Sequence, residues 1–150
     1  MIYADTNFFT SLLVEMPHSR EAERLAASAG TALPITWLLR LELINALQQC
    51  VFLSKQGSQD IRLTSEHALT LEGFFLDEIE AGFRFRRSYL EESVVEAVFH
   101  QLSHRHTARN GFRAYDVLHV ASALALNCYT FWSFDEKARK LAGLEGLALN

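Results

Sequence analysis

Four carboxylate side chains occupy positions that packing alone does not explain: Asp5, Glu42, Asp116 and Asp135. Asp5 ends the apolar run at residues 2–4, and Asp135 follows the apolar and aromatic segment at residues 128–134. Both runs have the character of buried strands, and open parallel sheets bind ligands just outside the carboxyl ends of their strands. We therefore expect Asp5 and Asp135 to lie at the same edge of a sheet.

Glu42 and Asp116 each interrupt an apolar segment with helical spacing. Glu42 lies within residues 37–44, which are otherwise almost all apolar apart from Arg40, and burying an unpaired charge costs several kcal/mol or more. In residues 114–126, Asp116, His119 and Ser122 are three residues apart, so they lie along one stripe of a helix. This stripe predicts a polar pocket, with His119 supporting the carboxylates rather than binding a ligand itself.

Each acid also has a purely structural interpretation. Asp5 and Asp135 both precede a predicted helix, where Asp often caps the first turn. Glu42 can pair with Arg40 or lie at an exposed edge of its helix, and Asp116 can face solvent. In a parallel α/β layout, however, the starts of helices face the same edge as the ends of strands. The convergence of four acids on that edge favours a shared site.

A cluster of carboxylates predicts a divalent cation. Neighbouring carboxylates raise one another's pKa values, so the ionised cluster is stable only with a cation among them. Mg²⁺ or Mn²⁺ fits best, because these ions prefer oxygen ligands and the chain lacks a Cys/His set with zinc spacing. The pair His104 and His106 lies in a polar, arginine-rich stretch and is interpreted as a solvated helix end.

A carboxylate-held Mg²⁺ commonly serves phosphoryl transfer, where the ion activates a water molecule and neutralises charge on the phosphate. Arg105, Arg109 and Arg113 precede Asp116 and can hold the flanking phosphates of a nucleic acid, although ordinary surface charge is the alternative for each of them. The sequence thus predicts a metal-dependent nuclease site with a local basic flank.

Composition indicates one globular domain, residues 1–150. The chain is 49% hydrophobic and 21% charged, with a formal net charge of −4, which excludes a protein that binds duplex DNA by charge alone. Cys50 and Cys128 stand among apolar residues, as reduced thiols in the cytosol do. No apolar run approaches the roughly 20 residues needed to span a bilayer. We expect a cytoplasmic protein without a membrane contact.

Hydrophobic periodicity predicts alternating strands and helices. Strands are expected at residues 2–4, 33–36, 82–86 and 128–134 and around Leu147, and helices after Asn7 and at residues 18–29, 37–53, 61–79, 90–106, 114–126 and 136–141. Right-handed crossovers between such strands produce a mainly parallel sheet covered on both faces. The fold class is therefore α/β, a three-layer α/β/α sandwich.

Four sequence blocks together resemble a known family. They are Tyr3-Ala4-Asp5-Thr6-Asn7, Leu41-Glu42, the run from Tyr115 to Ala121, and Ser133-Phe134-Asp135 ahead of Leu141-Ala142-Gly143. In this order and spacing the chain resembles the PIN-domain nucleases, and within them the VapC-type toxins of bacterial type II toxin–antitoxin systems. The resemblance extends over nearly the whole chain, except for residues 58–91, where no family motif is evident and where substrate choice can reside.

The resemblance implies a five-stranded parallel sheet and an acidic pocket in which Asp5, Glu42, Asp116 and Asp135 bind one or two Mg²⁺ or Mn²⁺ ions. It implies that Thr6 or Ser133, together with Asn7, supports the pocket or its waters. The implied reaction is endonucleolytic hydrolysis of single-stranded or looped RNA by a metal-activated water. Such proteins are usually homodimers, and a cognate antitoxin protein blocks or distorts the pocket.

Three other functions compete with this interpretation. The fold can serve as a catalytically silent module that binds RNA or protein, or as a housekeeping RNA-processing or DNA-directed nuclease. A receiver-like domain also has a Mg²⁺-binding acidic pocket, but it requires a lysine at the end of a late strand. Lys137 instead falls inside the last predicted helix, which disfavours the receiver.

Overall fold

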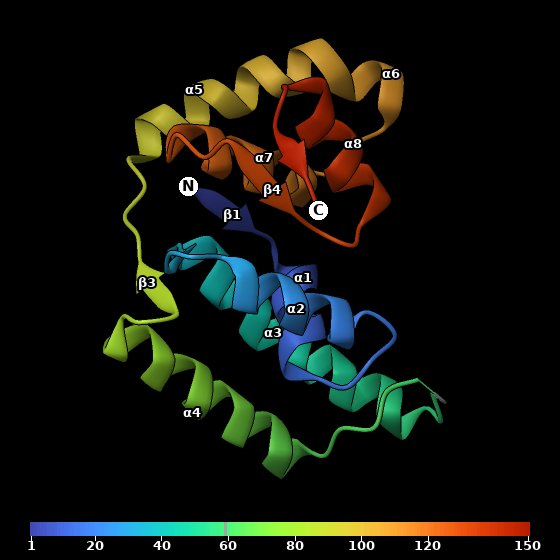
Figure 1. The fold of residues 1–150 in the computed structure, drawn as a ribbon. Coiled ribbons are helices and arrows are strands. Elements are labelled where there is room, and N and C mark those ends of the chain that lie inside the picture. The colour runs from blue at the N-terminus through green and yellow to red at the C-terminus, as the bar shows by residue number, and fades with distance from the viewer. Residues whose placement is uncertain (59) are drawn as a thin grey trace.

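The computed structural model of the chain describes residues 1–58 and 60–150 (Figure 1). Its strands are β1 (Ile2–Ala4), β2 (Leu33–Ile35), β3 (Phe85–Arg87), β4 (Thr130–Trp132) and β5 (Ala148–Leu149). Its helices are α1 (Thr6–Leu13), α2 (Ser19–Ser28), α3 (Trp37–Lys55), α4 (Ser65–Ala81), α5 (Glu92–Leu102), the π-helix η1 (Ser103–Thr107), α6 (Ala108–Asn110), α7 (Ala114–Ala125) and α8 (Glu136–Leu144). Every strand and helix expected from the sequence has a counterpart.

All strand pairs are parallel, as the α/β class requires. The strands divide into two hydrogen-bonded sheets, one with the order β1-β4-β5 and one formed by β2 and β3. β1 and β2 lie next to each other without a shared ladder. The expected five parallel strands are therefore present, but they form two sheets because no hydrogen-bonded ladder joins β1 to β2.

Alternate residues of the central strands face two separate cores. Tyr3 of β1 and Phe131 of β4 pack against α5, α7 and α8, whereas Ala4 and Trp132 pack against α1 to α4. Figure 1 shows these two groups of helices on opposite sides of β1 and β4. Side chains of a strand alternate between faces, so a strand buried on both sides is apolar at every position. This is the three-layer arrangement that the apolar runs predicted.

Several predicted boundaries were wrong. The helix expected from Ile61 begins at Ser65, because the Thr64 hydroxyl accepts from the backbone N–H of His67 at 3.1 Å and caps the first turn. The single helix expected at residues 90–106 begins at Glu92 and passes into the π-helix η1 after Leu102. Apolar spacing did not reveal this change, since the helix remains continuous.

The strands are shorter than their apolar runs. The strand expected at residues 82–86 covers Phe85–Arg87, because Gly82 ends α4 with a φ of 73°. The strand expected at residues 128–134 covers only Thr130–Trp132, and the helix expected at residues 136–141 extends to Leu144.

Both cysteine thiols are free and buried. In residues 1–58 and 60–150, no helix is both long and apolar enough to cross a membrane.

Candidate active site

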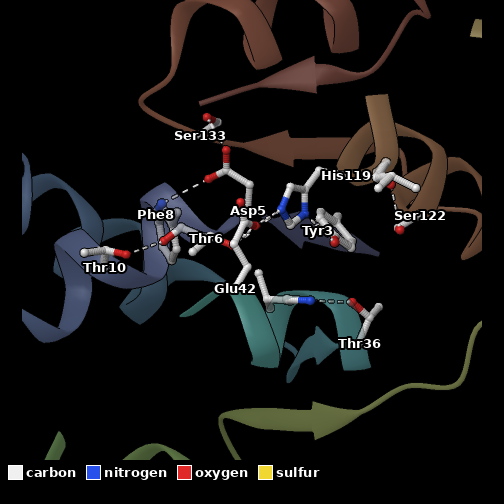
Figure 2. Close-up of polar contacts among 12 residues, drawn as sticks. Tyr3, Asp5, Thr6, Phe8, Thr10, Thr36, Glu42, His119, Ser122 and Ser133 are labelled. Atoms are coloured by element: carbon white, nitrogen blue, oxygen red, sulfur yellow. Dashed lines mark hydrogen bonds and ion pairs between the residues drawn. The ribbon is translucent and has the colours of Figure 1, made fainter. Parts of the chain in front are cut away.

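Asp5 lies at the carboxyl end of β1, where its backbone N–H donates to Trp132 of β4 at 3.0 Å. Its side chain is 4% exposed. Oδ1 accepts from the backbone N–H of Phe8 at 3.0 Å and Oδ2 accepts from the Ser133 hydroxyl at 2.6 Å (Figure 2). Asp5 therefore caps α1, as the structural interpretation proposed, and also faces the end of the neighbouring strand.

Glu42 projects from the second turn of α3 towards β1. Its Oε2 accepts a hydrogen bond from the Thr6 hydroxyl and contacts Nε2 of His119 on α7 (Figure 2). Arg40 is not among its partners in the described part of the chain, so the proposed Glu42–Arg40 pair was wrong. Residues far apart in the sequence compensate this carboxylate instead.

His119 links Glu42 to the interior of the protein. Its side chain is 4% exposed, and its Nδ1 lies 2.9 Å from the hydroxyl of Tyr3, which is fully buried. Its position agrees with a supporting role on the polar stripe of α7. Tyr3 was not expected at the site. The signal that could have found it is a tyrosine in an otherwise apolar strand, because a buried tyrosine hydroxyl usually has a hydrogen-bond partner.

Asp116 and Asp135 lie at the starts of α7 and α8 and are both half-buried. Asp116 Oδ2 accepts from the backbone N–H of Arg113 at 2.9 Å. Asp135 Oδ1 accepts from the backbone N–H groups of Lys137 and Ala138 at 2.8 and 2.9 Å, so Asp135 caps α8. The Ser133 hydroxyl, which donates to Asp5, also accepts the Asp135 backbone N–H at 2.9 Å.

All four acids line one pocket with a volume of about 260 Å³. The lining residues are Asp5, Thr6, Asn7, Glu42, Arg113, Tyr115, Asp116, His119, Asp135 and Ala138. The structure thus brings together the four predicted acids with Thr6, Asn7, His119 and Arg113. Ser133 is not among the lining residues, but its hydroxyl donates to Asp5. Tyr115, which sequence reasoning did not single out, lies at the pocket with its side chain 56% exposed.

The other two arginines of the predicted basic flank do not line this pocket. Arg105 lies on η1 and pairs with Glu145 at 3.1 Å, and His106 contacts the same carboxylate at 2.6 Å. Arg109 lies exposed on α6. The structure therefore places Arg113 at the acids and the two other arginines elsewhere on the surface.

Burial and hydrogen bonding shift the pKa values of Asp5 and Glu42 in opposite directions. Burial raises the pKa of Asp5 to about 6, against the lowering effects of His119, Ser133 and the Phe8 backbone. Burial also raises the pKa of Glu42, but hydrogen bonds from His119 and Thr6 outweigh it, so the pKa lies below its ordinary value.

The donor chemistry of the pocket fits a hard divalent cation. Four of the lining residues are carboxylates, the others include the hydroxyls of Thr6 and Tyr115 and the amide of Asn7, and no cysteine is among them. Within the described residues, no three acidic, histidine or cysteine side chains are grouped closely enough to hold a metal ion as they stand. Asp116 and Asp135 each direct one oxygen to a helix start, and the second oxygen of each has no hydrogen-bond partner among the described residues.

The fold is shared with solved structures from other organisms. The crystal structure of VapC20 from Mycobacterium tuberculosis matches with a TM-score of 0.64 and 17% identity, covering 93% of this chain and 94% of that one. FitAcB from Neisseria gonorrhoeae matches with a TM-score of 0.64 and 19% identity over 99% and 96% of the chains. VapBC2 from Rickettsia felis matches with a TM-score of 0.65 and 19% identity over 100% and 98%.

The sequence itself also identifies the family. None of the curated protein sequences matches the chain significantly. The PIN-domain family model, however, matches residues 2–144, which include all four pocket acids and every strand except β5. The family blocks recognised in the sequence and the shared fold agree with this match. The chain belongs to the PIN-domain family of nucleases.

Proposed function

We propose that the protein is a Mg²⁺- or Mn²⁺-dependent endoribonuclease and the toxin of a type II toxin–antitoxin system. The observation that carries the proposal is the convergence of four carboxylates from β1, α3, α7 and α8 on one pocket in a PIN fold. Hydrogen bonds at helix starts account for Asp5, Asp116 and Asp135 individually, but they do not account for Glu42 or for the convergence of all four acids on one pocket.

In this proposal Asp5, Glu42, Asp116 and Asp135 hold the cation. When bound, the ion would activate a water molecule for attack and neutralise charge on the phosphate. Ser133 keeps Asp5 directed at the pocket, and Thr6 does the same for Glu42. Because Ser133 and Thr6 are buried, their hydrogen bonds hold the carboxylates of Asp5 and Glu42 in place before any ligand binds.

The RNA would contact the pocket through Arg113 and Tyr115. Arg113 lines the pocket beside Asp116 and can donate to a backbone phosphate. Tyr115 has an exposed ring on which an unpaired base can stack, a contact that single-stranded nucleic acid offers and a duplex does not. The net charge of −4 supports local contacts of this kind over a broad basic surface.

The solved relatives support the toxin role. VapC20 is described as a toxin that cleaves the sarcin–ricin loop. VapBC2 and FitAB were each solved bound to a DNA fragment. We accordingly propose a cytoplasmic RNA target and a cognate antitoxin for this chain. Large apolar side chains exposed on α3 and α4, including Phe52, Leu69 and Phe74, provide surface for a protein partner.

We also propose that the chain forms a homodimer. The support is a mainly apolar groove of about 550 Å³ among α3, α5 and α7, where Trp37 is 59% exposed. A second copy of the chain that packs its own Trp37 into this groove would cover it. Light scattering should then give about twice the chain mass of 17.0 kDa, and Trp37→Lys should return the monomer mass.

Cleavage of a labelled RNA pool tests the nuclease directly. We expect Mg²⁺-dependent cleavage by the wild type and, in folded Asp5→Asn and Asp116→Asn proteins, a loss exceeding the roughly 10–100-fold that removal of an outer-shell residue costs. Asp77→Asn is the matched control, because Asp77 is exposed on α4 away from the pocket. Cleavage that survives both pocket substitutions would exclude the assigned acids.

Cleavage of the RNA pool, together with growth of cells after induction, separates the competing functions. A catalytically silent binding module would leave the RNA pool intact with every metal. A housekeeping nuclease would cleave RNA, but its induction would not arrest growth. Growth arrest that a co-expressed neighbouring gene product relieves would support the toxin, and sequencing RNA ends after brief induction would identify the cleavage site.

A further inference from the structure

A chain of polar contacts runs from the interior of the protein to Glu42. The Tyr3 hydroxyl lies 2.9 Å from Nδ1 of His119, and Nε2 of the same ring contacts Glu42 Oε2. Figure 2 shows these three side chains together with Thr6, whose hydroxyl donates to the same Glu42 oxygen and lies 3.4 Å from Nε2 of His119. The partners come from β1, α3 and α7, so the chain of contacts exists only in the folded protein.

The inner end of this chain is rigid. The Tyr3 ring is fully buried and stacks on Phe131, with ring centroids 5.8 Å apart and an interplanar angle of 8°. A hydroxyl in such a place is costly unless it is hydrogen-bonded, and one of its partners is the buried His119 ring. The Tyr3–His119 contact is therefore fixed by the packing of both rings.

The direction of the hydrogen bonds follows from the chemistry of the groups. A tyrosine hydroxyl carries a proton at neutral pH, so the Tyr3 hydroxyl, 2.9 Å from Nδ1, can donate to it. A neutral imidazole that accepts at Nδ1 carries its proton at Nε2. Nε2–H then donates to Glu42, a carboxylate that can only accept.

This arrangement gives the two oxygens of Glu42 different roles. Oε2 accepts from both Thr6 and His119, whereas Oε1 has no hydrogen-bond partner among the described residues. Oε1 is also not buried, because the one buried, unpartnered side-chain oxygen or nitrogen in those residues belongs to Thr107. Since Glu42 lines the pocket, Oε1 is the oxygen that remains available there.

We propose that Tyr3 and His119 are positioning residues that fix the tautomer of the imidazole and the rotamer of Glu42, so that Glu42 presents Oε1 alone to a cation. The part of this inference that concerns the cation rests on the proposed function. The part that concerns the tautomer does not, because it follows from the Tyr3 and Glu42 contacts of the ring.

Ring-nitrogen NMR of His119 in the metal-free protein tests the tautomer. We expect a protonated Nε2 and an unprotonated Nδ1 in the wild type. Tyr3→Phe, which removes only the hydroxyl, should increase the fraction of rings protonated at Nδ1. A His119 ring that is protonated at Nδ1, or at both nitrogens, in the wild type would overturn the inference. The exposed Tyr129→Phe is the control and should leave the His119 signals unchanged.

Mn²⁺ binding, followed by electron paramagnetic resonance, tests the consequence for Glu42. We expect Tyr3→Phe to weaken Mn²⁺ binding about 10-fold, the low end of what loss of an outer-shell partner costs, in a protein that remains folded. His119→Gln retains an N–H donor for Glu42 and should bind more tightly than His119→Leu. Equal affinity in wild type and Tyr3→Phe would overturn the positioning role.

The two proposals fail in different ways. Absence of Mn²⁺ binding by the wild type would contradict the proposed function, while the NMR signals of His119 would still decide the tautomer. Normal Mn²⁺ binding and RNA cleavage in the wild type, with no change in Tyr3→Phe, would contradict the positioning role and leave the nuclease intact.

Discussion

The four acids of the pocket form two pairs with different structural roles. The inner pair, Asp5 and Glu42, obtains hydrogen bonds from partners distant in the sequence, such as Ser133 and His119. The outer pair, Asp116 and Asp135, accepts from backbone N–H groups at the starts of its own helices. The outer acids therefore stabilise the fold in the absence of an ion, whereas the inner acids depend on precise tertiary contacts.

The difference has an energetic consequence. A carboxylate at a helix start interacts favourably with free N–H groups and the positive end of the helix dipole. Asp5 also caps a helix, but its burial is deep enough to raise its pKa to about 6. When no cation compensates it, the buried Asp5 carboxylate therefore destabilises the folded protein, whereas Asp116 and Asp135 stabilise it.

Asp5→Asn should produce the largest effect. Replacing the buried carboxylate by a neutral amide should increase the free energy of unfolding of the metal-free protein at pH 8 by about 3 kcal/mol, the equivalent of a pKa raised from 3.8 to about 6. Mg²⁺ should raise the melting temperature of the wild type and not that of the variant. Denaturant unfolding with and without Mg²⁺ measures both effects.

The pH dependence of this difference has a defined sign. The folded protein binds the Asp5 proton more tightly than the unfolded chain does, so the contribution of Asp5 to stability is present below pH 3.8 and is lost as pH rises to about 6. The advantage of Asp5→Asn should therefore grow from pH 4 to pH 7. A constant difference over this range would show that Asp5 is not destabilising.

Ser133→Ala should have the next largest effect, because the Ser133 hydroxyl serves both pairs. It donates to Asp5 and accepts from the backbone of Asp135, and it is fully buried. Its removal leaves buried groups unsatisfied, which costs about 1–3 kcal/mol. Ser11→Ala is the matched control, because Ser11 is also buried but bonds only the Met16 sulfur. Equal losses of unfolding free energy in the two variants would show that the hydrogen bonds of Ser133 stabilise the fold no more than that of Ser11.

Asp135 allows capping and ion binding to be separated. Asp135→Ala should lower the free energy of unfolding by about 1 kcal/mol, whereas Asp135→Asn, which can still cap α8, should lower it by only a few tenths. Both should weaken Mn²⁺ binding. Thr64→Ala removes the cap of α4, far from the pocket, and should match the stability loss of Asp135→Ala without affecting Mn²⁺. Unchanged Mn²⁺ binding in both Asp135 variants would show that Asp135 caps α8 and does not bind the ion.

The outer pair and Asp5 could be predicted from local sequence, but the partners of the inner pair could not. Strand ends and helix starts are local features, and in parallel α/β proteins they share an edge, so Asp5, Asp116 and Asp135 could be placed together. Capping and pocket formation also proved compatible, because a carboxylate has two oxygens and a cap engages one of them at Asp116 and Asp135.

Glu42 shows the limit of this reasoning. Local sequence suggested Arg40 as its partner, but Thr6 and His119 occupy that role from 36 and 77 residues away. The Tyr3–His119 contact spans 116 residues. Helical spacing correctly placed His119 on the polar stripe of α7, but it gave no information about which strand that stripe would face. Such pairings depend on sheet order and helix packing, which periodicity does not encode.

The smallest expected effects concern the arginines. Arg113→Gln should raise the KM for RNA severalfold and reduce the salt dependence of log kcat/KM by about one phosphate contact, because its side chain lines the pocket. Arg105→Gln should leave both unchanged and cost less than about 1 kcal/mol of stability, since Arg105 is exposed and the change breaks a pair with Glu145 and a long hydrogen bond to the Gln101 carbonyl.

The contrast between the two arginines extends the contrast between the acids. The backbone N–H of Arg113 donates to Asp116, so its side chain starts beside the outer pair, and RNA bound by it would reach the pocket from that side. If Arg105→Gln and Arg109→Gln raise KM as much as Arg113→Gln, the RNA follows α6 and η1 instead. The outer pair would then no longer mark the entrance for the substrate, and the approach to the inner acids would lie elsewhere.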